Sequence, residues 1–188
     1  QLAYEEMGAK AHTFSPAYTR EEFPTILRYS SHVTFNSLSQ IEQMRPLMPT
    51  DGSVSFGLRV NPEYSAVETD LYNPCAPGSR FGVPAAELPE LPEGVEGFHF
   101  HSLCEGTAED LEKTLQIIEK NFGHFLPRLK WLNMGGGHLM TRRDYDVEHL
   151  VSVLRAFGER HPNLHLILEP GSAFGWQTVY LTSSVVDV

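Results

Sequence analysis

The sequence Leu-Asn-Met-Gly-Gly-Gly-His at residues 132–138 decides how the whole chain is interpreted, because a β-type run passes directly into three glycines. Gly135, Gly136 and Gly137 can bring the backbone close to an anion and present several N–H groups to it. A flexible turn between a strand and a helix would carry the same residues. The stretch therefore indicates the end of a strand, followed either by a phosphate site or by a plain turn.

Short β-rich runs alternate with longer helical stretches on both sides of this loop. Strands are predicted at 11–15, 32–36, 54–61, 97–102, 130–134 and 164–169, and helices at 20–29, 39–47, 108–121 and 147–159. The strand centres are largely apolar on successive residues, as in a parallel sheet covered on both faces. The predicted fold class is α/β, a partial (β/α)8 TIM-type barrel with about six of eight units. An open doubly wound sheet is the alternative.

The domain organisation follows from the same pattern. Residues 1–177 are predicted to form the partial barrel, and 178–188, which are β-rich, to begin a C-terminal β-domain. The first residues resemble the second half of a helix that Gly8 stops, so we expect the chain to be part of a longer protein. Residues 62–92 form a long insertion rich in Pro, Gly, Asn and Asp, and loops of this length are usually functional or disordered. Their aromatic residues favour order.

Composition limits the partners and the compartment. The net charge is −10, and the basic residues are scattered, which argues against a nucleic-acid surface. No apolar run approaches the roughly 20 residues of a membrane span, and nothing resembles a signal peptide. Cys75 and Cys104 have no metal-type or redox spacing and suit free thiols. We expect a cytoplasmic protein with no membrane or nucleic-acid partner.

Two charged residues stand near the carboxyl ends of apolar strands. Glu169 closes the run Leu166–Glu169 and would need a cation or a donor, such as a protonated pyridine nitrogen. A carboxylate that caps backbone amides is the alternative. Arg59 would need an anionic partner if it is buried, which could be a phosphate, a cofactor or a carboxylate. Structural pairing of Arg59 with Glu169 or another acid is equally compatible with the sequence.

A third strand end carries two histidines. His99 and His101 alternate along the strand and are expected to point to the same side. They could form a metal pair with a later carboxylate, as in a zinc-type hydrolase. Alternatively, one imidazole stacks on a flat cofactor ring while the other is hydrogen-bonded inside. A histidine buried in the core without a function is the third interpretation.

The order of these features along successive strand ends resembles the fold-type III pyridoxal-phosphate decarboxylases, whose barrel is like that of alanine racemase. Within that group, the chain is similar over nearly its whole length to the family that decarboxylates carboxynorspermidine and carboxyspermidine. The matching motifs include Tyr72–Cys75 (YNPC), Ser79–Gly82 (SRFG), His99–Glu105 (HFHSLCE) and Gly135–Thr141 (GGGHLMT).

The resemblance implies a set of cofactor-binding residues: Arg59, His101, Gly135, Gly136, Gly137, Glu169 and Gly171. His101 would stack on the pyridine ring, and Glu169 would pair with its nitrogen. The three glycines would bind the phosphate, and Arg59 would support the ring on its hydroxyl side. Relatives often carry an arginine directly after Glu-Pro-Gly, where this chain has Ser172. That difference leaves the phosphate more dependent on backbone amides.

The activity implied by the resemblance is a pyridoxal-phosphate-dependent carboxy-lyase of polyamine biosynthesis, whose products are norspermidine or spermidine. The substrate would be a small polyamine precursor, and the intact enzyme would be a homodimer. The family's cofactor-binding lysine lies upstream of anything in this chain. Lys10, Lys113, Lys120 and Lys130 are not at carboxyl strand ends. No catalytic residue is therefore assigned here, and the chain alone is expected to be inactive.

Two other function classes remain open from the sequence. A metal-dependent barrel hydrolase would use His99, His101 and Glu105, and would carry zinc. A non-catalytic regulator derived from such a decarboxylase would lack the lysine in its full-length sequence. Bound zinc would identify the hydrolase, and a full-length gene without the cofactor-binding lysine would identify the regulator.

Overall fold

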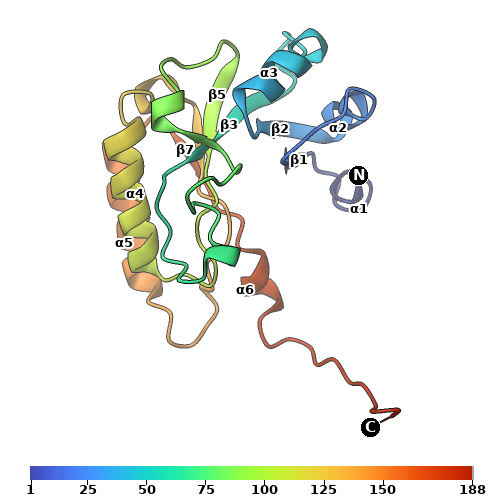
Figure 1. Cartoon of the computed structure of the whole chain (residues 1–188), viewed down its shortest axis with the longest axis vertical. Helices are drawn as coiled ribbons and strands as arrows, with labels where there is room; N and C mark the ends of the chain where they lie inside the picture. The colour runs from blue at the N-terminus through green and yellow to red at the C-terminus, as the bar shows by residue number, and fades with distance from the viewer. Residues whose placement is uncertain (188) are drawn as a thin grey trace.

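The computed structural model describes residues 1–187 and consists of a seven-stranded parallel sheet with helices packed against it (Figure 1). The strands run in the order β1-β2-β3-β5-β6-β7, and β4 pairs only with β3. Their bounds are β1 Ala11–Phe14, β2 Ser30–Phe35, β3 Ser55–Asn61, β4 Val83–Pro84, β5 Val95–His99, β6 Trp131–Asn133 and β7 His165–Ile167. Because the spatial order of the strands follows the chain, the sheet is a barrel wall without a switch point. The predicted partial barrel is confirmed, and the doubly wound alternative is wrong.

Helices α2 to α5 lie in the connections between strands, whereas α1 precedes β1 and α6 follows β7. Their bounds are α1 Leu2–Met7, α2 Phe23–Tyr29, α3 Leu38–Met44, α4 Ala108–Phe122, α5 Val147–Arg160 and α6 Gly171–Gly175, with short 3-10 turns η1 Arg45–Leu47, η2 Asp70–Tyr72, η3 Ala85–Glu87 and η4 Leu126–Arg128. Thr107 and Asp110 form a reciprocal capping box that begins α4. Helix α2 begins three residues later than predicted because Pro24 occupies its first turn, where a missing N–H costs nothing.

The apolar core lies between the sheet and these helices. In α4 the side chains of Leu111, Leu115 and Ile118 are buried at helical spacing, as the sequence predicted. Phe98 of β5 contacts the ring of Phe122 edge-on, with 6.0 Å between the ring centroids. Helices α4 and α5 lie side by side on this face (Figure 1). This packing fixes the carboxyl ends of β5 and β6 relative to each other.

The inner face of the sheet is polar and aromatic. The rings of His12 and His32 stack with centroids 3.8 Å apart, and the indole Nε1 of Trp131 donates to Ser55 Oγ at 2.9 Å. Barrel interiors are more often filled by branched aliphatic side chains. Burial, together with His12 and His165, lowers the pKa of His32 to about 4. The ring of His32 on β2 lies edge-on to the indole of Trp131 on β6, with 5.3 Å between the centroids, although β3 and β5 lie between these two strands. The sheet therefore curves around one interior.

The insertion and the ends of the chain complete the description. The insertion is ordered by β4, η2 and η3, in agreement with the expectation from its aromatic residues. Gly8 caps α1 with φ +63°, also as predicted. Residues 178–187 form neither helix nor strand, so the predicted β structure is not present there, and Val188 lies outside the described residues. Across residues 1–187, no helix has the length and hydropathy needed to cross a bilayer.

Replacing Gly97 tests the inner packing. A Cβ there would lie 2.0 Å from the indole of Trp131. We expect Gly97→Ala to lower the free energy of unfolding by about 1–3 kcal/mol, because the ring must shift against a packed interior. Urea denaturation measures this change. In Gly158→Ala on α5, the new Cβ would lie 3.8 Å from Leu166, so this variant should be neutral or slightly stabilising. Equal losses in the two variants would contradict this account.

Candidate cofactor site

The glycine loop after β6 passes between the ends of two neighbouring strands. A Cβ on Gly135 would lie 2.5 Å from Phe100 O, and one on Gly136 would lie 2.4 Å from Glu169 O. A Cβ on Gly137 would lie closer still to a carbonyl, 2.1 Å from Leu103 O. Gly135 and Gly137 also have positive φ, but Gly136 does not. A plain turn would need glycine only for its dihedral angles, so close packing is the additional reason for three glycines.

The hydrogen bonds of the loop leave its central N–H groups available. The carbonyl of Gly135 accepts from the Glu169 N–H and that of Gly137 accepts from the Gly106 N–H, both at 2.8 Å. The N–H of Gly136 has only a long contact of 3.4 Å to His101 Nδ1. Within residues 1–187 the N–H of Gly137 has no acceptor. Available N–H groups beside buried backbone are what an anion requires, and the loop therefore fits a phosphate.

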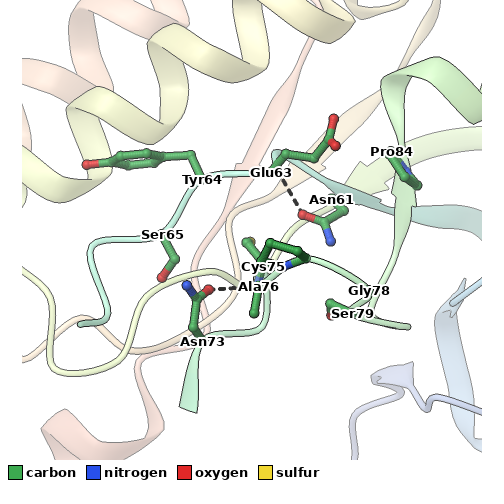
Figure 2. A pocket seen from close by; sticks show the side chains of 11 residues that line it. Asn61, Glu63, Tyr64, Ser65, Asn73, Cys75, Ala76, Gly78, Ser79 and Pro84 are labelled. Carbon is green, nitrogen blue, oxygen red and sulfur yellow. Dashed lines mark hydrogen bonds between the residues drawn. The ribbon is translucent and has the colours of Figure 1, made fainter. Parts of the chain in front are cut away.

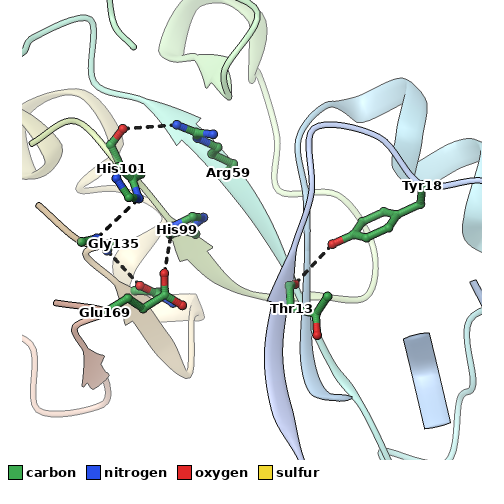
Figure 3. Close-up of polar contacts among 9 residues, drawn as sticks. Thr13, Tyr18, Arg59, His99, His101, Gly135 and Glu169 are labelled. Atoms are coloured by element: carbon green, nitrogen blue, oxygen red, sulfur yellow. Dashed lines mark hydrogen bonds and ion pairs between the residues drawn. The ribbon is translucent and has the colours of Figure 1, made fainter. Parts of the chain in front are cut away.

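Glu169 lies beside the loop and is partly exposed. One carboxylate oxygen, Oε1, accepts from Asn133 Nδ2 at 2.9 Å, and the other, Oε2, lies 3.8 Å from His99 Nε2. Figure 3 shows this carboxylate close to the two histidines. The proposed alternative, a carboxylate that caps backbone amides, is not what the chain forms. A carboxylate with one free side can pair with a protonated ring nitrogen.

Arg59 is a buried cation without an anionic partner among residues 1–187. It is 7% exposed, its Nη2 donates to the carbonyl of His101 at 3.2 Å, and its guanidinium lies 4.8 Å from the Phe81 ring centroid. Burial lowers the pKa of Arg59. The structural ion pair with Glu169 is not formed, so that alternative is wrong. An unpaired buried guanidinium is costly, and an anionic ligand would remove the cost.

The two histidines differ in their surroundings. His99 is fully buried, and within residues 1–187 neither of its ring nitrogens has a hydrogen-bond partner. Burial, together with Arg59 and His101, lowers the pKa of His99 to about 3, so it is neutral at pH 7. His101 is more exposed, and its ring is perpendicular to that of His99, with 6.4 Å between centroids. The expectation that one of the pair is hydrogen-bonded inside is therefore wrong for His99.

A metal site would use a different acid from the one predicted. His99, His101 and Glu169 place ligand atoms within 4.8 Å of one another. Glu105, the predicted third ligand, lies outside this group on an exposed turn with φ +52°. Burial, and after it the charge of Arg59, lowers the pKa of both histidines. The same positive field disfavours a bound metal cation and favours an anion.

The remaining predicted positions lie as follows. The N–H of Gly171 donates to Glu169 O at 2.8 Å, but a Cβ on Gly171 would meet nothing within 4 Å, so a need for glycine there stays a prediction. Among residues 1–187, no lysine lies at the carboxyl edge of the sheet. Lys130, for example, pairs with Glu96 near the amino end of β5. The position of the cofactor-binding lysine outside this chain stays a prediction.

The insertion forms a cavity of about 440 Å³ beyond the carboxyl end of β3 (Figure 2). Asn61 Oδ1 accepts from the Glu63 N–H and Asn73 Oδ1 from the Cys75 N–H, each at 2.8 Å. These bonds hold the cavity wall in shape. Burial raises the pKa of Cys75 to about 11, so this free thiol is protonated. The family resemblance implies that this insertion helps to form the substrate cleft, and that role stays a prediction.

Two contributors were missed from the sequence. Asn133 is 3% exposed and contacts both the loop and Glu169. Its signal was a polar residue at the end of an otherwise apolar strand, directly before the glycines. Phe14 of β1 lies 4.7 Å from His99 and 6.3 Å from His101, measured between ring centroids. No motif marks it, because an aromatic residue in a strand is ordinary.

Comparison with known families decides the assignment. Residues 6–175 match the pyridoxal binding domain of the pyridoxal-dependent decarboxylases. The chain belongs to this family. It is 51% identical over its whole length to carboxyaminopropylagmatine decarboxylase from Synechocystis sp., and it covers 49% of that protein. It is 40% identical to carboxynorspermidine/carboxyspermidine decarboxylase from Campylobacter jejuni, of which it covers 48%. The chain thus spans about half the length of these relatives.

Solved structures of this pyridoxal-dependent family agree with the fold. The carboxynorspermidine decarboxylase of Campylobacter jejuni, complexed with norspermidine, superposes with a TM-score of 0.80 at 37% identity. The match covers 94% of this chain and 44% of that structure. A diaminopimelate decarboxylase superposes with a TM-score of 0.69 at 18% identity, covering 89% of this chain and 43% of that structure. This second match supports the fold alone.

Substitution of Gly136 tests the phosphate loop. A methyl group there collides with the Glu169 carbonyl, so the loop must move. We expect Gly136→Ala to weaken the affinity of the whole protein for pyridoxal phosphate by at least about tenfold, as for the loss of charge-assisted hydrogen bonds. Fluorescence titration of the apoprotein measures the affinity. Gly175→Ala, whose Cβ would meet nothing within 4 Å, is the matched control. Undiminished affinity in Gly136→Ala would contradict the assignment.

The buried histidines give a pH dependence. Burial lowers the pKa of His99 to about 3 and of His138 to about 4, from 6.5. Unfolding exposes both histidines and returns their pKa to about 6.5. Their contribution to the free energy of unfolding is therefore fully present above pH 6.5 and is lost as the pH decreases below it. The slope is at most about 1.4 kcal/mol per pH unit for each histidine. Urea denaturation between pH 7 and 5 measures it. In His138→Gln the free energy of unfolding should decrease less steeply between pH 7 and 5. An unchanged or steeper decrease in that variant would contradict the assignment of the pH dependence to His138.

Proposed function

We propose that this chain is the cofactor-binding part of a pyridoxal-phosphate-dependent decarboxylase that acts on a carboxylated polyamine precursor. The observation that carries the proposal is the convergence at one sheet edge of Arg59, a cation without an anionic partner in residues 1–187, and of a glycine loop with available N–H groups. These groups suit an anionic cofactor. Glu169 beside them suits the ring nitrogen of that cofactor.

The roles of the residues follow from their chemistry. The N–H groups of Gly136 and Gly137 would hold the phosphate, and Arg59 would support the ring on its hydroxyl side. His101 would lie against the face of the ring, and Glu169 would keep a proton on the pyridine nitrogen. When bound, pyridoxal phosphate supplies an electron sink for the electrons left behind as CO2 departs. The carboxylate of Glu169 increases that capacity, because it stabilises the protonated ring.

The substrate proposal is broader than the one made from the sequence. The relatives are named for carboxynorspermidine, for carboxyspermidine and for carboxyaminopropylagmatine. In all three substrates the carboxylate belongs to an aminopropyl group on a longer cationic chain. The chain ends in a primary amine in the first two and in a guanidinium in the third. We propose the carboxyaminopropyl group as the common element, and assay of the three compounds distinguishes the chain ends.

The other predicted properties remain part of this proposal. The homodimer follows from the family resemblance, and the cytoplasmic location is compatible with the two free cysteines. The hydrolase alternative is favoured by three possible metal ligands that lie close together, His99, His101 and Glu169. The positive charge of Arg59 beside both histidines argues against a bound metal cation. The regulator alternative depends on whether a cofactor-binding lysine is present in the whole protein.

Glu169→Gln tests the proposed chemistry in the whole protein. The wild type should release CO2 from at least one of the three compounds, and carry pyridoxal phosphate rather than zinc. We expect kcat of Glu169→Gln to fall by about a hundredfold, because a neutral amide cannot stabilise the protonated ring. Glu159→Gln on the exposed side of α5 is the matched control. Zinc-dependent hydrolysis without decarboxylation would overturn the proposal.

A further inference from the structure

Asn133 is the last residue of β6, and its side chain lies between the glycine loop and Glu169. It is 3% exposed. In the sheet it is paired with His99 of β5 and Ile167 of β7, and its carbonyl accepts from the Phe100 N–H at 2.9 Å. Its backbone is therefore fixed on both sides. A side chain anchored in this way has few alternative positions.

Both ends of the Asn133 amide are in use. Its Nδ2 donates to Glu169 Oε1 at 2.9 Å, and its Oδ1 accepts from the Gly135 N–H at 2.9 Å. The opposite orientation of the amide would place a donor against an N–H and an oxygen against a carboxylate. The partners thus dictate one orientation. One buried amide joins the first glycine of the loop to the carboxylate.

The other groups around Glu169 are farther away or bind elsewhere. His99 Nε2 is 3.8 Å from Oε2, beyond hydrogen-bond distance, and Arg59 donates to the His101 carbonyl. Within residues 1–187, Asn133 is the one donor that reaches the carboxylate at hydrogen-bond distance. It also binds the residue that sets the path of the loop, since Gly135 has φ +67° and no room for a side chain.

We propose that Asn133 is a positioning residue that couples the two ends of the cofactor cradle, the phosphate loop and the carboxylate that faces the ring nitrogen. The inference rests on the proposed function. The Oδ1 contact holds Gly135, and with it the path of the backbone that carries the N–H groups of Gly136 and Gly137. The Nδ2 contact fixes the plane of the Glu169 carboxylate. A ligand that engages both ends therefore gains from a geometry set in advance.

Two substitutions separate the two contacts in the whole protein. Asn133→Asp keeps an acceptor for the Gly135 N–H but replaces the donor to Glu169 by a second carboxylate. Asn133→Leu, of similar size, removes both contacts. Calorimetry on the apoproteins gives dissociation constants for pyridoxal 5′-phosphate and for pyridoxal, which lacks the phosphate. The dissociation constant of pyridoxal divided by that of pyridoxal 5′-phosphate reports how much the phosphate loop adds to the affinity. This ratio does not depend on how much of a sample is folded.

We expect Asn133→Asp to weaken pyridoxal binding by about tenfold, as for loss of a hydrogen bond to a charged group, and to leave the ratio unchanged. Asn133→Leu should weaken pyridoxal binding and also lower the ratio. Asn121→Asp on α4 is the control for the added charge. Wild-type affinities in both Asn133 variants, or an equal fall of the ratio in both, would overturn the inference. A wild type that binds neither compound would overturn the proposed function as well.

Discussion

The site depends on one steric constraint, the passage of the backbone after β6 between the ends of β5 and β7. Contacts of 2.1–2.5 Å would arise if any of the three loop glycines carried a Cβ. This closeness lets the loop carbonyls bind neighbouring backbone and leaves the N–H groups of Gly136 and Gly137 available, apart from the long contact of Gly136 to His101 Nδ1. It also brings Glu169, which follows the end of β7, within reach of Asn133. His101 and Glu169 lie beside the loop because the glycines let the backbone after β6 approach the segments that follow β5 and β7.

The parts of the fold that sequence could predict are those governed by local pattern. The six principal strands and four longer helices were found because apolar periodicity, the Thr107 cap and Gly8 are local signals. The polar residues at strand ends were found for the same reason. The parallel order of the strands then brings them to one edge, which the structure confirms for Arg59, His101 and Glu169.

The misses concern partners that only three-dimensional packing determines. The sequence predicted Glu105 as the acid near the histidines, whereas Glu169 lies there, because spacing along a chain does not measure distance across a barrel. It could not exclude an ion pair between Arg59 and Glu169, which the orientation of the guanidinium toward His101 O rules out. The β-rich composition of residues 178–187 indicated a strand, but a strand also needs a partner, and none is paired with it among residues 1–187.

The open sheet has a consequence for handling the chain by itself. Within residues 1–187, β1 pairs only with β2 and β7 pairs only with β6, so each has one edge of backbone N–H and C=O groups without a strand beside it. Such edges act as templates for any extended segment. Preparations of the isolated chain will therefore tend to self-associate edge to edge. Added strands or a covering segment at those two edges would be the rational way to keep it monodisperse.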